Sequence, residues 1–197
     1  MNQQEHKDFI RQQLLASAKL KSELAASDHL HDLIHQVTDV MVSCFSKDGK
    51  VLLCGNGGSA ADAQHLSAEL SGRFRKDRPP LFAEALHVNT SFMTAVANDY
   101  SYAEVFARMV RAMGRSGDIL LAFSTSGHSP NVLRAVEQAR KQKMICIGFT
   151  GKDGGMLGEM CDIELRIPSE DTARIQEGHM LLGHTICELV EKILFPG

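Results

Sequence analysis

The sequence has no apolar stretch that approaches the length of a membrane span, and its first residues contain no apolar signal region. It also lacks C-x-x-C pairs, and its cysteines are five, an odd number. Four of the five lie in apolar runs, where a free thiol behaves as a small core residue. These absences argue against a disulfide scaffold and predict a protein of the reducing cytoplasm.

Several signatures of common functions are also missing. There is no G-x-x-x-x-G-K-[ST] loop, which argues against ATP hydrolysis, and no G-x-S-x-G elbow. The cysteine spacing suits no zinc finger. The net charge is −3, with 21 Lys and Arg scattered among 24 Asp and Glu, so no basic footprint for nucleic acid is present. We therefore expect neither a nucleic-acid nor a membrane partner.

The hydrophobic pattern predicts an α/β fold. Short apolar runs alternate with helical segments, which is typical of a parallel sheet with helices on both faces. With 197 residues and no repeat or linker, we expect one domain, with a helical pair over 1–48 and an α/β core over 49–197. The expected strands are 50–54, 82–88, 118–123, 144–149 and 162–167, followed by a helix over 172–194.

Two further helices are expected before the first strand, at 3–26 and 28–46. The second has a clear apolar stripe of 3.6-residue period, and Asp28 is in position to cap it. Two such helices have no place in a repeating βα unit. They need another surface to pack against, and a partner subunit is one candidate.

The most informative segment runs from Cys54 to Glu69. An apolar run ends in a glycine-rich turn, after which Ser59 is expected to cap a helix. His65 and Glu69 are four residues apart and share one face of that helix. The combination predicts an anion pocket beside a metal or acid–base site. The alternatives are glycines that serve only a tight turn and an ordinary solvent-facing His/Glu pair.

The same turn also fits the G-x-G-x-x-A dinucleotide fingerprint. That function needs an acidic residue at the end of the second strand, to hold a ribose hydroxyl. The expected second strand ends Leu86-His87-Val88-Asn89, without one, which argues against NAD.

A second polar loop, Ser124 to Pro130, follows the expected strand 118–123. Pro130 suits the first position of a helix, with Ser129 as its cap. The loop lies at the carboxyl edge of the sheet, and it carries four hydroxyl groups in six residues. Hydroxyl donors beside a helix N-terminus predict a phosphate cradle, against the alternative of a merely polar loop.

The final helix carries Gln176 and His184, which are eight residues apart. On a straight helix they are separated by about 12 Å along the axis and about 80° around it. Two such side chains meet at one ion only when both are nearly fully extended, or else they approach from different subunits. His179 points elsewhere and is expected to be structural.

Taken in order, these residues resemble the phosphoheptose isomerases of the sugar isomerase (SIS) family. The resemblance covers essentially the whole chain and rests on residues 54–66, 97–100, 124–129, 150–155 and 174–179. It implies an SIS fold with a five-stranded parallel sheet. It also implies an aldose–ketose isomerase that converts sedoheptulose 7-phosphate to D-glycero-D-manno-heptose 7-phosphate for lipopolysaccharide or capsule. Members are homotetramers with active sites between subunits.

The family's roles carry over residue by residue. Glu69 becomes the catalytic base and His184 the acid. One Zn²⁺ per subunit is implied, although a carboxylate that binds zinc is a poorer base. The implied zinc ligands are His65, Glu69, Gln176 and His184. The implied substrate-binding residues are Asn56, Gly57, Gly58, Ser59, Glu69, Asn98, Asp99, Ser124, Thr125, Ser126, Ser129, Asp171 and Gln176.

Two departures from the family pattern are minor. His128 stands where the serine loop usually has Asn or Lys, and the acid that some members have at the position of Ala173 is here at Asp171. Two rival readings remain. One is a non-catalytic SIS protein that binds the bacterial replication initiator, in which the positions of Glu69 and His184 are not an acid and a histidine. The other is an SIS isomerase of another sugar phosphate.

Overall fold

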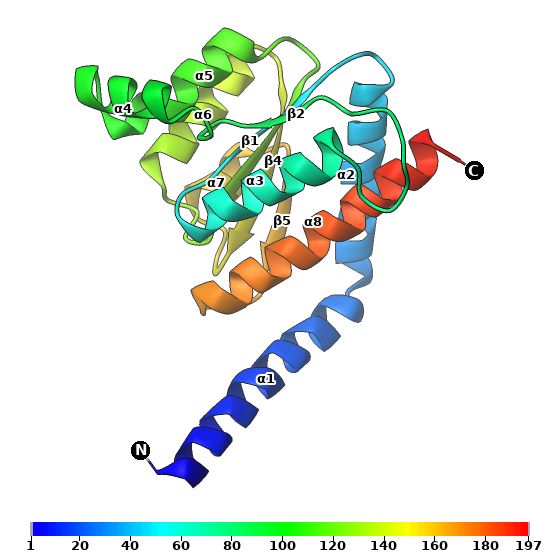
Figure 1. The fold of residues 1–197 in the computed structure, drawn as a ribbon, viewed down its shortest axis with the longest axis vertical. Coiled ribbons are helices and arrows are strands. Elements are labelled where there is room, and N and C mark those ends of the chain that lie inside the picture. Colours follow the sequence, from blue (N-terminus) through cyan, green and yellow to red (C-terminus); the bar gives the residue numbers. More distant parts are fainter. Residues whose placement is uncertain (1, 197) are drawn as a thin grey trace.

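The computed structural model describes residues 2–196, and a parallel sheet of five strands forms its centre (Figure 1). The strands are β1 (Val51–Cys54), β2 (Ala83–Ala85), β3 (Ile119–Ser124), β4 (Ile145–Gly151) and β5 (Ile163–Ile167). Their order across the sheet is β2-β1-β3-β4-β5, and each neighbouring pair is parallel. The predicted sheet is confirmed.

The strand bounds differ from the expected ones chiefly at β2, which is limited to Ala83–Ala85 within the expected 82–88. This strand lies at the edge of the sheet and pairs with β1 alone. Beyond Ala85, the Val88 N–H bonds back to the Ala85 carbonyl, which turns the chain away from the sheet.

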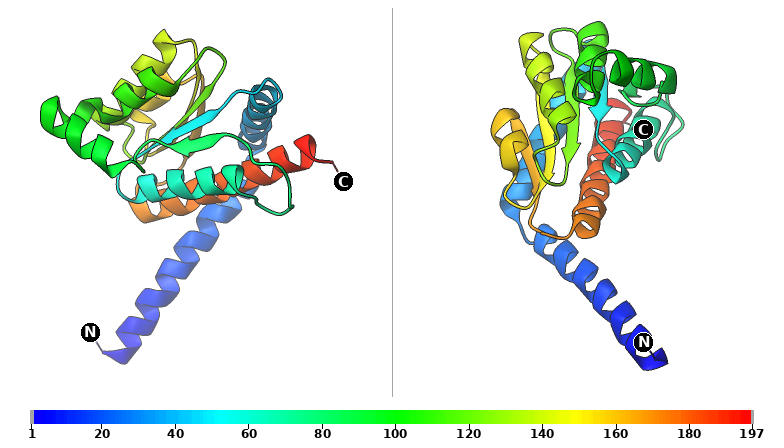
Figure 2. Two further views of the ribbon diagram at one scale, coloured as in Figure 1. Left: turned by 45° about the horizontal axis from the view of Figure 1, so that its top comes forward. Right: turned by 90° about the vertical axis from the view of Figure 1, so that its left-hand side faces the viewer.

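Helices cover both faces of the sheet (Figures 1 and 2). On one face lie α2 (Asp28–Phe45), α3 (Gly58–Ser71) and α8 (Thr172–Leu194). The other carries α4 (Thr90–Asp99), the short 3-10 helix η1 (Tyr102–Glu104), α5 (Val105–Met113), α6 (Pro130–Lys141) and α7 (Gly155–Met160). Val51 and Leu53 pack in the first hydrophobic cluster, whereas Leu52 and Cys54 pack in the second. Burial on both faces explains why β1 reads as a continuous apolar run.

The N-terminal helix α1 (Gln3–Ala25) extends away from the rest of the chain (Figure 2). Two hydrogen bonds join it to α8: Arg174 Nη1 donates to the Gln13 carbonyl at 2.8 Å, and the Ser17 hydroxyl donates to Glu177 at 2.8 Å. Toward its end, Leu20 and Leu24 are buried. Its first half exposes an apolar stripe of Phe9, Ile10, Leu14 and Leu15. No helix among residues 2–196 combines the length and apolar character needed to cross a bilayer.

The helix α2 finds its packing surface within the chain, against α8 and β5. The expected cap at Asp28 is wrong by one residue. Ser27 is the N-cap, since its hydroxyl accepts a hydrogen bond from the Leu30 N–H at 3.2 Å, and Asp28 is the first helical residue. The Asp28 carboxylate still lies in the first turn, where its negative charge interacts favourably with the helix dipole.

The sheet order places a topological switch point between β1 and β3. The chain leaves β1 toward α3 on one face and leaves β3 toward α6 on the other. The two connections therefore diverge at the carboxyl edge of adjacent strands, which is where open α/β sheets bind ligands. Both polar segments singled out in the sequence lie there.

Candidate active site

The turn after β1 starts α3 earlier than expected. The helix begins at Gly58 with Gly57 as its N-cap, so the expectation that Ser59 caps it is wrong. Gly57 has φ +56° and ψ −119°, a backbone conformation that strains any residue with a Cβ. Because this glycine reverses the chain, Ser59 already lies in the first turn, where it is buried. The helix N-terminus has no side-chain cap. The N–H groups of Ser59, Ala60 and Ala61 bond to the carbonyls of Asn56 and Gly57, and the helix dipole at this end favours an anion.

The serine loop lies beside this turn, because β3 pairs with β1. Ser124 ends β3 and is buried, and its hydroxyl lies 3.0 Å from that of Ser129. Ser129 is the N-cap of α6 and Pro130 its first residue, as predicted, but the Ser129 hydroxyl makes no bond to the helix. The hydroxyls of Ser124 and Ser129 instead meet at the helix N-terminus, where the dipole favours a negative charge.

The two loops are joined by an amide pair that the sequence did not reveal. Asn56 and Asn131 each donate their side-chain N–H to the other's side-chain oxygen at 2.8 Å. The Tyr102 hydroxyl also donates to the Asn56 oxygen, at 3.1 Å. Asn131 is only 2% exposed, so this pair fixes the turn after β1 against the start of α6. The sequence feature that could have indicated this pair is Asn131, a polar residue at a buried position of α6.

The remaining predicted substrate residues lie in the serine loop and at the ends of α4 and α8. Thr125 and Ser126 are half-buried in the serine loop, and His128 is exposed. Asn98 and Asp99 end α4 and are joined by a 2.9 Å hydrogen bond between their side chains. Asp171 caps α8, where its carboxylate accepts from the Ala173 N–H at 2.8 Å.

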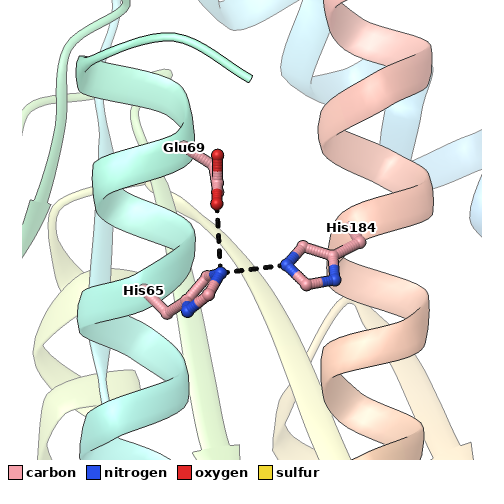
Figure 3. A group of neighbouring side chains, drawn as sticks. All are labelled: His65, Glu69 and His184. Carbon is pink, nitrogen blue, oxygen red and sulfur yellow. Dashed lines mark hydrogen bonds and ion pairs between the residues drawn. The ribbon is translucent and has the colours of Figure 1, made fainter. Parts of the chain in front are cut away.

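The predicted metal or acid–base cluster forms between α3 and α8 (Figure 3). His65 Nε2 lies 3.0 Å from Glu69 Oε1 and 3.0 Å from His184 Nε2. One ligand atom from each of the three side chains lies within 4.8 Å of the other two. A tetrahedral metal at about 2.0–2.1 Å from each nitrogen holds its donors roughly 3.3 Å apart, so this set fits a metal ion.

The environment of His184 also suits a metal ligand or a neutral acid–base group. Partial burial lowers the pKa of His184, and the neighbouring His65 lowers it further, while Glu69 acts in the opposite direction. The Phe74 ring stacks on the His184 ring, with centroids 5.5 Å apart and planes at 16°. A neutral imidazole leaves one ring nitrogen free to bind a metal.

Gln176 lies nearer the N-terminus of α3 than this cluster does. Its side chain packs directly against Gly58, where a side chain on residue 58 would clash with the Gln176 amide. Gly58 precedes His65 by seven residues, or about 10 Å along α3. Within one chain, therefore, Gln176 faces the N-terminus of α3, and the three other predicted ligands meet farther along the two helices.

His179 has the structural role expected of it. It is fully buried, and its Nε2 lies 2.9 Å from the Thr150 carbonyl oxygen. Burial lowers the pKa of His179 to about 4, so the ring is neutral and donates this hydrogen bond. Phe123 and Phe149 pack against it edge-on.

The chain is similar in sequence to proteins of known family. Residues 16–151 match the family model described as SIS domain. The phosphoheptose isomerase of Burkholderia pseudomallei is 46% identical over 187 residues, which are 95% of each chain. That of Shewanella sediminis is 49% identical over 180 residues, 90% of this chain and 91% of the relative.

Solved structures agree as well. A phosphoheptose isomerase from Francisella tularensis superposes with a TM-score of 0.91 at 43% identity, covering 95% of this chain and 98% of the other. That from Neisseria gonorrhoeae gives 0.89 at 42%, covering 94% and 98%.

Proposed function

Because this chain belongs to the phosphoheptose isomerase family of SIS-domain proteins, we propose that it converts sedoheptulose 7-phosphate to D-glycero-D-manno-heptose 7-phosphate. The observation that carries the proposal is the His65, Glu69 and His184 cluster, since a non-catalytic relative has no need of converging acid and base groups. The chain is a sugar-phosphate isomerase, an enzyme of the intramolecular oxidoreductase class.

The substrate phosphate binds at the switch point. The Ser124–Ser129 loop and the turn over 56–59 supply hydroxyl and backbone donors, and two helices, α3 and α6, direct their N-termini to this edge. The Asn56–Asn131 pair holds the two loops in register before the substrate arrives. Binding energy at the phosphate is thereby available to position the reacting carbons.

The reaction moves one proton between adjacent carbons. Glu69 removes a proton from C1 of the ketose while His184 gives one to the oxygen on C2, which yields an enediol. Return of the carbon proton to C2, with loss of the hydroxyl proton from the oxygen on C1, yields the aldose. No atom is gained or lost, so the reaction needs no redox cofactor.

We assign His65, Glu69 and His184 as the residues that would hold one Zn²⁺ per subunit. Glu69 would then bind through one carboxylate oxygen and keep the other for the C1 proton, and His184 would bind through Nε2 and keep its proton on Nδ1. Two histidine nitrogens and a carboxylate suit zinc with a position left open. When bound there, Zn²⁺ would supply Lewis-acid polarisation of the substrate carbonyl. Gln176 contacts substrate at the N-terminus of its own α3, or it completes the ligand set of a second subunit.

The oligomer is a homotetramer with active sites shared between subunits. The apolar stripe of Phe9, Ile10, Leu14 and Leu15 on α1 supports this assembly, because such a stripe gains about 25 cal/mol for each Å² that it buries. All five cysteines are free, which suits the reducing cytoplasm. There the product enters nucleotide-activated heptose synthesis for lipopolysaccharide or capsule.

The test is direct turnover. Purified protein with added Zn²⁺ is mixed with sedoheptulose 7-phosphate, and formation of the aldose is followed by NMR. Turnover only of a different sugar phosphate supports another SIS isomerase. Absence of turnover, together with tight binding to a replication-initiation protein, supports the non-catalytic alternative.

A further inference from the structure

A buried carboxylate on α8, outside the cluster already described, gathers four hydrogen bonds. Glu191 is 1% exposed. It accepts from the backbone N–H groups of Phe74, Arg75 and Lys76 at 3.2, 2.8 and 2.8 Å, and from Arg78 Nε at 2.9 Å. Burial raises the pKa of Glu191, but these donors outweigh it and hold the pKa below its usual value. The carboxylate is thus a fixed anion around which the chain after α3 is wrapped.

Its partner Arg78 reaches back to the end of α3. The Arg78 side chain is 2% exposed. Its Nη1 donates to the Leu70 carbonyl at 3.0 Å, and its Nη2 donates to the Glu69 carbonyl at 2.9 Å. These are carbonyls of the last turn of α3, which have no partner within the helix. The ion pair of Glu191 and Arg78, here called the clamp, therefore ties α8 directly to the backbone of Glu69.

The clamp also determines what lies against His184. Glu191 accepts a hydrogen bond from the backbone N–H of Phe74, and the Phe74 ring stacks on the His184 ring. Glu191 follows His184 by seven residues, which is two helical turns and nearly the same face of α8. Both helices that supply the cluster in Figure 3 are thus held by one buried ion pair beyond it.

We propose that the Glu191–Arg78 clamp is a positioning device for the His65–Glu69–His184 cluster. It sets the spacing of α3 and α8 and, through Phe74, the plane of the His184 ring. A buried ion pair is seldom the cheapest source of stability, but its directional bonds fix one register between helices that apolar contacts alone allow to slide. The proposal rests on the proposed function for its catalytic consequence and on the cluster's fit to a metal for its test.

The test measures metal affinity. Glu191→Gln, Arg78→Lys and Phe74→Leu are compared with wild type, and Asp118→Asn is the matched control. Asp118 forms a 2.6 Å ion pair with Lys50, also largely buried, but at the start of β3. Zn²⁺ and Co²⁺ dissociation constants come from chelator competition, the visible spectrum reports Co²⁺ geometry, and thermal unfolding reports stability. His184→Ala gives the background binding of other histidines.

We expect the two clamp variants, Glu191→Gln and Arg78→Lys, and also Phe74→Leu, to bind both ions about 10 to 100-fold more weakly, with an altered Co²⁺ spectrum, as when a group that orients metal ligands is lost. Asp118→Asn loses stability but keeps wild-type affinity and spectrum. If Glu191→Gln does not fold, Phe74→Leu, which leaves the ion pair intact, must still show the change.

Wild-type affinity and spectrum in folded clamp variants overturn the proposal, as does an equal loss in Asp118→Asn or a wild type that binds neither ion above background. A wild type that binds metal but does not isomerise the heptose overturns only the proposed function.

Discussion

His65 and His184 stand 119 positions apart in the chain, yet their Nε2 atoms face each other at 3.0 Å. At most one proton lies between two nitrogens at this distance. At least one of the two nitrogens is therefore unprotonated, and its lone pair points toward the other ring. With Glu69 Oε1 at 3.0 Å from His65, the three side chains form a partly exposed cluster of possible metal ligands (Figure 3). Most of what the enzyme is expected to do depends on this pairing.

We first expect isomerase activity to depend on a bound metal ion. Exhaustive chelation should abolish isomerase activity, and Zn²⁺ should restore it. His65→Ala should lower kcat/KM by roughly 100-fold or more, because removal of a ligand also disturbs Glu69. Elemental analysis and kinetics on the same samples check this. Full activity in chelated protein shown to be metal-free contradicts the metal assignment.

The proton transfer from carbon depends on Glu69. Glu69→Gln keeps the size and one oxygen of the side chain but loses its basicity, so kcat should fall by about 10² to 10⁴-fold with little change in KM. Glu137→Gln, on the exposed side of α6, is the control and should keep wild-type rates. Comparable activity in the two variants assigns the base elsewhere.

Phosphate binding depends on the serine loop. Ser124→Ala removes the hydroxyl that meets Ser129 at 3.0 Å and should raise KM by roughly 10- to 150-fold, since one hydrogen bond to a charged group is worth about 1.5–3 kcal/mol. Inhibition by inorganic phosphate should weaken in parallel. Ser22→Ala, on the surface of α1, serves as the control. An unchanged phosphate inhibition constant in Ser124→Ala places the phosphate at another site.

Stability should fall in mild acid because of His179. Its folded pKa is about 4 against an ordinary value of 6.5, so the neutral ring stabilises the fold fully above pH 6.5. That contribution is lost progressively as the pH falls from 6.5 toward 4, and in full it amounts to about 3 kcal/mol. Urea unfolding at several pH values checks this. His179→Gln should be less stable at pH 7.5 but should lose less on acidification, and an identical pH slope in both proteins disproves the assignment.

Sharing of the active site between subunits follows from the position of Gln176. If this side chain serves the cluster of a second chain, Gln176→Ala and His65→Ala, each inactive alone, should regain activity when co-refolded. Assembly from both variants creates some sites with neither lesion. Size-exclusion chromatography must show mixed oligomers. Inactive mixed oligomers confine Gln176 to its own chain's site.

The sequence predicted those features that depend on local pattern. Buried strands such as β1 and β3 are continuous apolar runs because both sheet faces are covered, and the i,i+4 spacing was enough to align His65 with Glu69. The helix starts were missed by one or two residues. Ser27 and Gly57, rather than Asp28 and Ser59, begin α2 and α3, because the backbone conformation of the turn decides the cap.

Residues that act through tertiary contacts could not be found in this way. Asn131 and Phe74 carry no motif, and Glu191 reads as one more polar position on an amphipathic helix. Their roles depend on α3 and α8 lying side by side and on α6 meeting the turn after β1. The eight-residue spacing predicted that Gln176 and His184 are far apart on α8. It did not predict that the Gln176 side chain lies beside Gly58.

The most direct test of the account is the incubation of zinc-loaded wild-type protein with sedoheptulose 7-phosphate, followed by NMR of the sugar carbons. We expect D-glycero-D-manno-heptose 7-phosphate to accumulate to equilibrium with the wild type, and not to accumulate with Glu69→Gln. Unchanged ketose after prolonged incubation with folded, metal-loaded protein contradicts it.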